Sequence, residues 1–455
     1  MAQTDSQPWN PDRSWADPFI AALVLAILLL AGGQWFRRRG PRPPEDQATL
    51  EGRIQGVVLG AAKANALASL KGFSLPGTAV GPLARGHRTG WDQALLAVHA
   101  AETGDLGEGA GLIQAAPGSA GEAFRQAWNW CYRGEGAPPA DAAFAQVRQA
   151  LGGGYAAQIL AARMLAKAGG DPGPLEAQAR TWATARLIAF GGISSAGFLL
   201  ALTGLGFALF LALVPAPPCP LPHYGMSGRA LLIVILGWFM TLLATGPAVA
   251  TAVRFLPFLK PVFLPLVYSL HASAGTAFLL RAEGVDLRTL WRRVAPGRHE
   301  AALAAGLGFF ALAFAAVVAV AVALSPLMPS GESPQRELLE LLAHLQGTWT
   351  VILLFLVVAV LAPFFEELMF RGFLLPWLGE RLSTRLGAHR GRILTVVITG
   401  VSFGAMHLQP LGLPTLATLG IVLGFAFLRT GNLVTSILVH GLWNGGVFIL
   451  MRALA

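Results

Sequence analysis

Long apolar runs recur along this chain, and they constrain its fold more than any other feature. The hydrocarbon core of a bilayer is about 30 Å thick, so a helix that crosses it needs about 20 consecutive apolar residues. Clear spans are predicted at Pro18–Phe36, Leu187–Val214, Ala230–Val253, Ala301–Leu324, Thr350–Leu375, Ile393–Met406, Leu411–Leu428 and Leu433–Leu450. The sequence therefore predicts an all-α polytopic transmembrane bundle of about eight or nine spans, with a soluble helical insert after the first span.

The composition supports this class of protein and excludes others. The chain of 455 residues is 54% hydrophobic and only 13% charged, which is not typical of a soluble protein of this length. Its formal net charge of +9 could indicate nucleic-acid binding, but the basic residues gather at the ends of apolar runs, as the positive-inside rule predicts. We therefore predict a lipid bilayer as the environment and no nucleic-acid partner.

The order of the runs divides the chain into four predicted regions. Residues 1–40 are predicted to form an N-terminal transmembrane anchor, 41–182 a cytoplasmic helical domain, 183–300 additional transmembrane helices, and 301–455 a membrane core. Acidic residues precede the first run and basic residues follow it, which is the reverse of a secretory signal peptide and predicts that the helical domain is cytoplasmic. The run Phe255–Leu280 contains three prolines, and its topology stays open.

Two adjacent carboxylates and an arginine interrupt lipid-compatible sequence in PFFEELMFRGF, Pro363–Phe373. A charge at mid-bilayer depth costs roughly 2.5–3.5 kcal/mol on insertion scales, so such residues are functional candidates by default. Glu367 and Arg371 are four residues apart, so they share a helix face and can form an ion pair. Glu366 points about a quarter turn away and is predicted to face a cavity.

Two later apolar segments carry further polar side chains at helical spacing. SFGAMH places Phe403 and His407 four residues apart, and HGLWN places His440 and Asn444 on one face. Hydrolysis of a peptide inside a membrane requires a water, a base and donors for the developing oxyanion. Glu366 can be the base, and His407 can share the proton or orient the water. His440 and Asn444 can donate hydrogen bonds to the oxyanion.

The same side chains also fit a metal site. One Glu and two His form a familiar catalytic zinc set, which leaves a coordination position open for water. Glu366, His407 and His440 are therefore also candidate ligands of Zn2+. The residues leave the choice between a metal mechanism and a cofactor-free glutamate mechanism open, because each of these side chains can also act as an acid or a base.

The motifs E-E-x-x-x-R, F-x-x-x-H and H-x-x-x-N, in this order on late transmembrane helices, resemble those of the CPBP family of intramembrane proteases. This family groups CAAX prenyl endopeptidases of the Ras-converting type with bacterial bacteriocin-processing and self-immunity proteins, the Abi group. The resemblance covers roughly Ala301–Ala455, and its motifs stand here as Glu366-Glu367-x-x-x-Arg371, Phe403-x-x-x-His407 and His440-x-x-x-Asn444.

The resemblance implies an intramembrane endopeptidase that acts on a membrane-associated peptide or protein. It implies that Glu366 activates water with His407, and that His440 and Asn444 form the oxyanion site. It also implies a bracing role for Glu367 with Arg371. The family is described both as metalloproteases and, in its Ras-converting branch, as glutamate-type proteases.

Nothing in the resemblance concerns residues 41–182, which contain no catalytic motif. Binding or regulation is the default prediction for residues 41–182, with a protein as the partner. The Ala-, Gly- and Arg-rich composition is typical of a bacterial protein, so we expect a bacterial inner membrane, with a membrane peptide, a bacteriocin leader or a partner protein as substrate.

Two other classes of function are compatible with parts of the pattern. A non-catalytic membrane scaffold or bacteriocin immunity protein would keep the site residues as structure. A transporter could use buried carboxylates and histidines as a proton relay, but the chain shows no pair of similarly broken helices in two halves. Neither H-E-x-x-H nor G-x-S-x-G occurs, which argues against the corresponding protease types.

Overall fold

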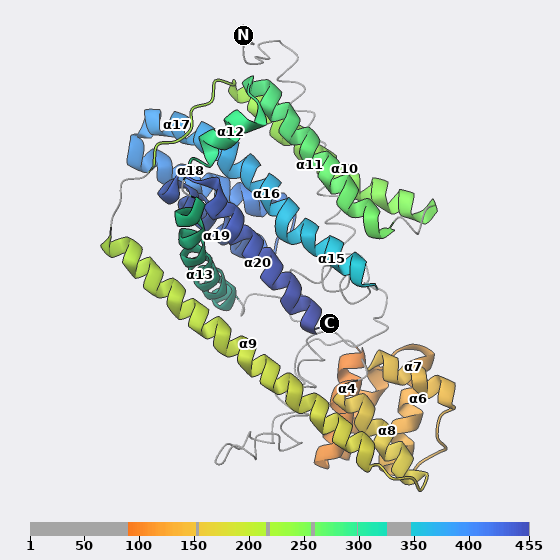
Figure 1. Ribbon diagram of the computed structural model, residues 1–455. Helices are drawn as coiled ribbons and strands as arrows, with labels where there is room; N and C mark the ends of the chain where they lie inside the picture. The colour runs from red at the N-terminus through yellow and green to blue at the C-terminus, as the bar shows by residue number, and fades with distance from the viewer. Residues whose placement is uncertain are drawn as a thin grey trace. The chain divides into compact units, whose positions relative to one another are not determined.

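The computed structural model describes residues 90–454, except 152–153, 215–218, 256–259, 298 and 325–346. Every regular element in the described residues is a helix, which confirms the predicted all-α class. Backbone contacts divide the chain into two compact units, and the boundary falls inside α9 (Gly173–Leu213), between Gly197 and Phe198. Figure 1 shows the helices of both units and labels most of them.

The N-terminal unit is a small helical domain. Its described helices are α4 (Gly90–Thr103), α5 (Leu106–Leu112), α6 (Gly118–Trp128), α7 (Asp141–Ala150), α8 (Tyr155–Lys167) and the first part of α9. Apolar residues pack around two buried indoles, Trp91 and Trp128, and Trp128 Nε1 donates to the Ala97 carbonyl at 3.1 Å. Arg163 of α8 forms two 2.7 Å hydrogen bonds with the Glu102 carboxylate of α4, which joins these helices.

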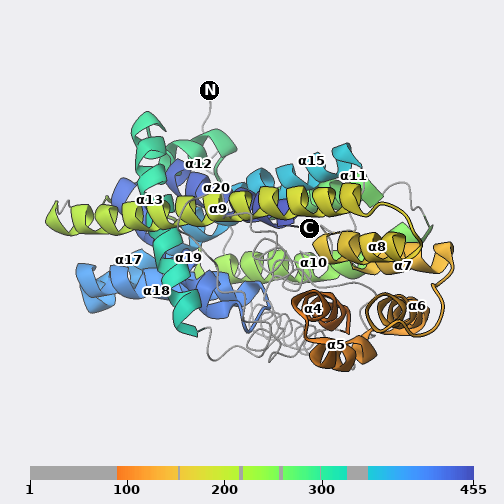
Figure 2. The ribbon, with the colours of Figure 1, turned by 90° about the horizontal axis from the view of Figure 1, so that it is seen from below.

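The second unit is a bundle of longer helices. Besides the end of α9, its described helices are α10 (Gly228–Phe255), α11 (Lys260–Glu283), α12 (Leu287–Val294), α13 (His299–Leu324), α15 (Thr348–Leu356), α16 (Ala362–Glu367), α17 (Leu375–Leu386), α18 (Ala388–Met406), α19 (Leu413–Thr430) and α20 (Leu433–Leu454). The π-helical segments η5 (Val357–Leu361) and η6 (Leu368–Leu374) join α15, α16 and α17 into one continuous helix, called the acidic helix below. α18 packs against both α17 and α19, and Figure 2 shows α17 and α18 side by side.

Five of the described helices are long and apolar enough to cross a membrane. They are Gly191–Leu213, His299–Leu324, Thr348–Leu386, Leu413–Thr430 and Leu433–Arg452. They coincide with five of the predicted runs, so the chain is an integral membrane protein. The predicted runs Ala230–Val253 and Ile393–Met406 lie in α10 and α18, and the predicted first span, Pro18–Phe36, lies outside the described residues.

An apolar core holds the later helices of this unit together around the acidic helix. It includes four phenylalanines that are at most 1% exposed, Phe309, Phe373, Phe403 and Phe427. α18 and α19 approach very closely where they cross, because a Cβ on Gly420 would lie 2.7 Å from the Gly400 carbonyl oxygen. Glycine at this crossing therefore brings the backbone of α19 into the interior of the bundle.

Candidate active site

Glu367 lies at the centre of a fully buried polar cluster. Its Oε1 accepts a hydrogen bond from Arg371 Nη1 at 2.7 Å and another from His440 Nδ1 at 2.9 Å. The side chains of Glu367 and Arg371 are 0% exposed, and that of His440 is 2% exposed. The four-residue spacing predicted the first contact, whereas the second joins the acidic helix to α20, 73 residues further along the chain.

Arg371 is held by contacts from two neighbouring helices. Its Nη2 donates to the Gly420 carbonyl of α19 at 2.7 Å, which the close crossing of α18 and α19 brings within reach. Its guanidinium carbon lies 4.8 Å from the ring centroid of Phe403 in α18. A charge-assisted hydrogen bond and a cation–π contact both lower the free energy of burying this cation.

Glu366 differs from its neighbour because it is accessible. Its side chain is 18% exposed, and its Oε2 lies 3.9 Å from His440 Nε2. His440 therefore stands between two carboxylates, with Nδ1 on Glu367 and Nε2 toward Glu366. The Glu367 carboxylate, ion-paired with Arg371, only accepts hydrogen bonds, so His440 Nδ1 carries the hydrogen of that contact. In the neutral ring, Nε2 is then an acceptor.

His407 stands at the end of α18, immediately after Met406. Its Nδ1 donates to the Phe403 carbonyl at 2.8 Å. Because a carbonyl can only accept, the neutral His407 ring also presents Nε2 as an acceptor. The Phe403 ring contacts both imidazoles, with centroid distances of 4.9 Å to His407 and 5.3 Å to His440. Phe403 thus connects the two histidines, which come from different helices.

Asn444 of α20 binds the backbone of the acidic helix. Its Nδ2 donates to the Val358 carbonyl in η5 at 3.0 Å. The Ala362 N–H donates to the Val357 carbonyl five residues earlier, so the next donor in this register would be the Pro363 nitrogen, which carries no hydrogen. Asn444 supplies the missing donor to Val358. The Asn444 amide nitrogen has a second hydrogen, which can donate a hydrogen bond to another oxygen.

Tyr224 is a residue of this site that the sequence did not reveal. It lies in the loop before α10, is buried, and its hydroxyl donates to the carbonyl of Gly372, the residue after Arg371. Burial raises the pKa of the Tyr224 hydroxyl above its ordinary value, so the hydroxyl keeps its proton and donates. No spacing in the sequence indicates this contact, because Tyr224 and Gly372 are 148 residues apart.

The loop that carries Tyr224 is fixed by its neighbours. The N–H groups of Gly225 and Met226 donate to the Glu283 carboxylate at 3.1 and 3.2 Å. Trp377 Nε1 of α17 donates to the Met226 carbonyl at 3.2 Å. These bonds tie the loop to both α11 and α17, so the Tyr224 hydroxyl is held in place against the acidic helix.

The predicted zinc ligands do not form a metal-binding group in this arrangement. Within the described residues, no three His, Cys, Asp or Glu side chains are placed to hold a metal ion together. His440 directs Nδ1 to Glu367 and Nε2 toward Glu366. His407 packs on Phe403 instead. The Zn2+ hypothesis stays a prediction.

Residues 348–446 match the family model of the Rce1-like type II CAAX prenyl endopeptidases. The match covers a minority of the chain, but it contains every predicted catalytic residue from Glu366 to Asn444, whereas Tyr224 lies outside it. A search of curated proteins found no match, and a search of solved structures found none.

Proposed function

We propose that the protein hydrolyses a peptide bond of a membrane-associated peptide or protein, because residues 348–446 match the family model of the Rce1-like type II CAAX prenyl endopeptidases. The observation that carries the assignment of the base is the contrast between two adjacent carboxylates. Glu367 is sealed in an ion pair with Arg371, whereas the Glu366 side chain is 18% exposed. Only the second of these carboxylates is accessible to a water molecule.

Glu366 acts as the general base in the proposed reaction. It takes a proton from a water molecule as the water oxygen attacks the carbonyl carbon of the scissile peptide bond. The acceptor Nε2 of His407 can hold the same water in place, because Nδ1 is already occupied by the Phe403 carbonyl. Glu366 then passes its proton to the leaving amine, which balances the reaction as hydrolysis. Arg371 neutralises the charge of the buried Glu367, so we assign the role of general base to Glu366.

The developing oxyanion requires hydrogen-bond donors, and we assign this role to two side chains of α20. Asn444 retains one amide hydrogen after donating to Val358. In its doubly protonated form, His440 donates Nδ1–H to Glu367 and offers Nε2–H near Glu366, where the tetrahedral intermediate forms. Removing a single donor of this kind typically lowers kcat by about 10²–10³-fold.

The test replaces the base while preserving its shape. Glu366→Gln should lower turnover of a fluorogenic prenylated CAAX peptide in proteoliposomes by about 10²–10⁴-fold, the usual contribution of a general base. The melting temperature should stay close to that of the unmodified protein. Glu300→Gln is the matched control, because Glu300 is an exposed carboxylate in the first turn of α13. Wild-type turnover in Glu366→Gln would reject this assignment of the base.

The same variant identifies the substrate. A base-deficient enzyme that still binds its substrate should retain it through purification, and mass spectrometry of the co-purified peptides then gives the sequence at the scissile bond. Recovery of a peptide with a prenylated C-terminal cysteine would assign a CAAX substrate. Recovery of an unprenylated membrane peptide would assign a different substrate to the same chemistry.

A further inference from the structure

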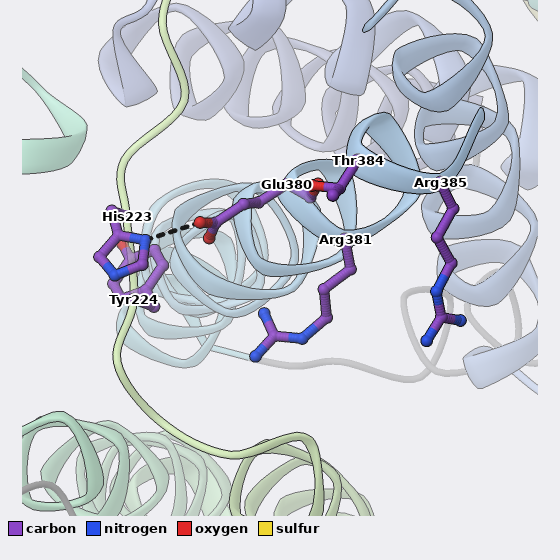
Figure 3. Close-up of a pocket in the computed structure, with 6 residues that line it drawn as sticks. All are labelled: His223, Tyr224, Glu380, Arg381, Thr384 and Arg385. Atoms are coloured by element: carbon purple, nitrogen blue, oxygen red, sulfur yellow. Dashed lines mark hydrogen bonds and ion pairs between the residues drawn. The ribbon is translucent and has the colours of Figure 1, made fainter. Parts of the chain in front are cut away.

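Tyr224 belongs to a part of the membrane bundle that the family match does not include. The match covers residues 348–446, whereas Tyr224 lies in the loop of residues 219–227, before α10. Figure 3 shows His223 and Tyr224 on this loop, next to α17, with a hydrogen bond between His223 and Glu380. Tyr224 is only 2% exposed. A buried polar side chain from outside the matched region therefore reaches the helix that carries the proposed base.

Two contacts join Tyr224 to the π-helical segment η6. Its hydroxyl donates to the Gly372 carbonyl, and its ring packs against Phe373 with 4.9 Å between the ring centroids. At the end of η6 the Leu375 N–H donates to the Phe370 carbonyl, five residues earlier, whereas an α-helix uses a step of four. Such segments are rare and occur frequently at functional sites. Tyr224 therefore contacts the acidic helix where its backbone departs from the α-helical register.

Gly372 is the residue of η6 with the most backbone freedom. Glycine has no Cβ, so a glycine inside a helix restricts the backbone less than any other residue does. The torsion angles of Gly372 set the direction of the half that carries Glu366 and Glu367 relative to α17, which packs against α18. A hydrogen bond to the Gly372 carbonyl fixes the direction of that carbonyl. The Tyr224 hydroxyl therefore restricts these torsion angles.

The loop that carries Tyr224 can supply such a restraint because it is itself held on three sides. Its Gly225 and Met226 N–H groups donate to Glu283 of α11, whose side chain is 5% exposed and pairs with Arg293 of α12 at 3.2 Å. A tryptophan of α17 donates to the Met226 carbonyl at 3.2 Å. The position of the hydroxyl is therefore fixed by α11, α12 and α17 together.

Given the proposed peptidase function, we propose that Tyr224 is a positioning residue of the active site. It holds the backbone at Gly372, so that the Glu366 carboxylate keeps its place 3.9 Å from His440 Nε2. Tyr224 acts through the backbone and is not bonded to the reacting groups. A misplacement of about 1 Å can lower a rate by about 10²-fold. The segment before residue 348 therefore completes a site whose reacting groups all lie within the family match.

Tyr224→Phe removes the hydroxyl and keeps the ring. For the full chain in proteoliposomes we expect kcat on the fluorogenic prenylated peptide to fall about 10–100-fold, with KM within about twofold, because the variant displaces the base and leaves the substrate-binding groups in place. Tyr132→Phe is the matched control, since it removes a tyrosine hydroxyl that donates to Glu102 at 2.9 Å in the N-terminal unit. A kcat within about twofold of the unmodified protein, a change confined to KM, or equal losses of kcat in both variants would overturn the proposal.

Gly372→Ala tests the mechanism at the residue that Tyr224 restrains. Alanine narrows the backbone freedom at this position without help from the hydroxyl. A Cβ there would lie 3.1 Å from Leu368 Cδ1, the end of a flexible side chain, so a small shift accommodates it. Tyr224→Phe should therefore lower kcat at least about threefold less in the Gly372→Ala background than in the unmodified protein. Equal losses in the two backgrounds would refute the role of Gly372.

Hydrogen exchange measures the restraint on η6 without any peptide turnover. If the unmodified protein does not hydrolyse the peptide, the proposed peptidase function fails, whereas exchange still reports on Tyr224. Tyr224→Phe should raise the exchange rate of the η6 amide hydrogens about tenfold more than that of the α19 amide hydrogens, because the loss of the restraint opens η6 locally. Unchanged exchange in η6, or an equal rise in η6 and α19, would overturn the positioning role.

Discussion

Replacing Glu367 with glutamine removes the carboxylate that forms a direct ion pair with the buried Arg371. Glu367 Oε1 receives Arg371 Nη1 at 2.7 Å and His440 Nδ1 at 2.9 Å, and none of these side chains is more than 2% exposed. Removing one partner of a buried ion pair typically costs about 3–5 kcal/mol, because the other charge stays desolvated. We expect a loss of this size in the free energy of unfolding for Glu367→Gln, and a similar loss for Arg371→Met.

The double variant decides whether this cost comes from the pair itself. Glu367→Gln combined with Arg371→Met leaves no uncompensated charge, so its cost should be about 3 kcal/mol or more below the sum of the two single costs. Equilibrium unfolding of the four proteins in mixed micelles measures this coupling. Glu300→Gln serves as a surface control that should stay within about 0.5 kcal/mol of the unmodified protein. Additive costs, or single variants that each lose less than about 1 kcal/mol, would refute the reasoning.

Three further results are expected. Tyr224→Phe leaves the Gly372 carbonyl without its hydroxyl donor and should lower the free energy of unfolding by about 1–3 kcal/mol in the same micelle assay, and an unchanged value would contradict the contact. Treatment with the chelator 1,10-phenanthroline should leave peptide turnover unchanged, because no three His, Cys, Asp or Glu side chains among the described residues are placed to hold a metal ion together. Loss of activity with the chelator and its recovery with Zn2+ would establish the metal mechanism instead. Burial raises the pKa of the Cys131 thiol to about 12, so alkylation of this thiol by iodoacetamide should be slow at pH 8. The alkylation rate should increase about tenfold per pH unit up to that pKa, because only the thiolate reacts. A rate that levels off near pH 9 would contradict the raised pKa and show an ordinary thiol.

Two carbonyls of the acidic helix accept hydrogen bonds from outside the helix. Pro363 lacks the N–H group that would donate to Val358 in the five-residue register of η5, and Asn444 donates to this carbonyl instead. The Gly372 carbonyl accepts a hydrogen bond from Tyr224. Unpaired backbone groups are costly inside a membrane, so these bonds stabilise the helix on both sides of its charged residues.

The sequence could predict features that depend on local spacing. The length and hydropathy of the apolar runs predicted the transmembrane helices, because a bilayer of fixed thickness selects runs of that length. The four-residue separation predicted the contact between Glu367 and Arg371, because helix geometry alone places such residues together. The order of three motifs predicted a resemblance to this family of proteases, and the match of residues 348–446 to the Rce1-like family model supports it.

Only the tertiary structure decided which distant groups meet. Glu367 and His440 are 73 residues apart, so no local spacing in the sequence predicts their hydrogen bond. This bond orients the His440 ring between two carboxylates, and it depends on how α20 packs against the acidic helix. The same packing seals Glu367 and leaves Glu366 accessible, although the two are neighbours with identical side chains. Helical periodicity fixes the face on which a residue lies, whereas contacts between helices fix what that face meets.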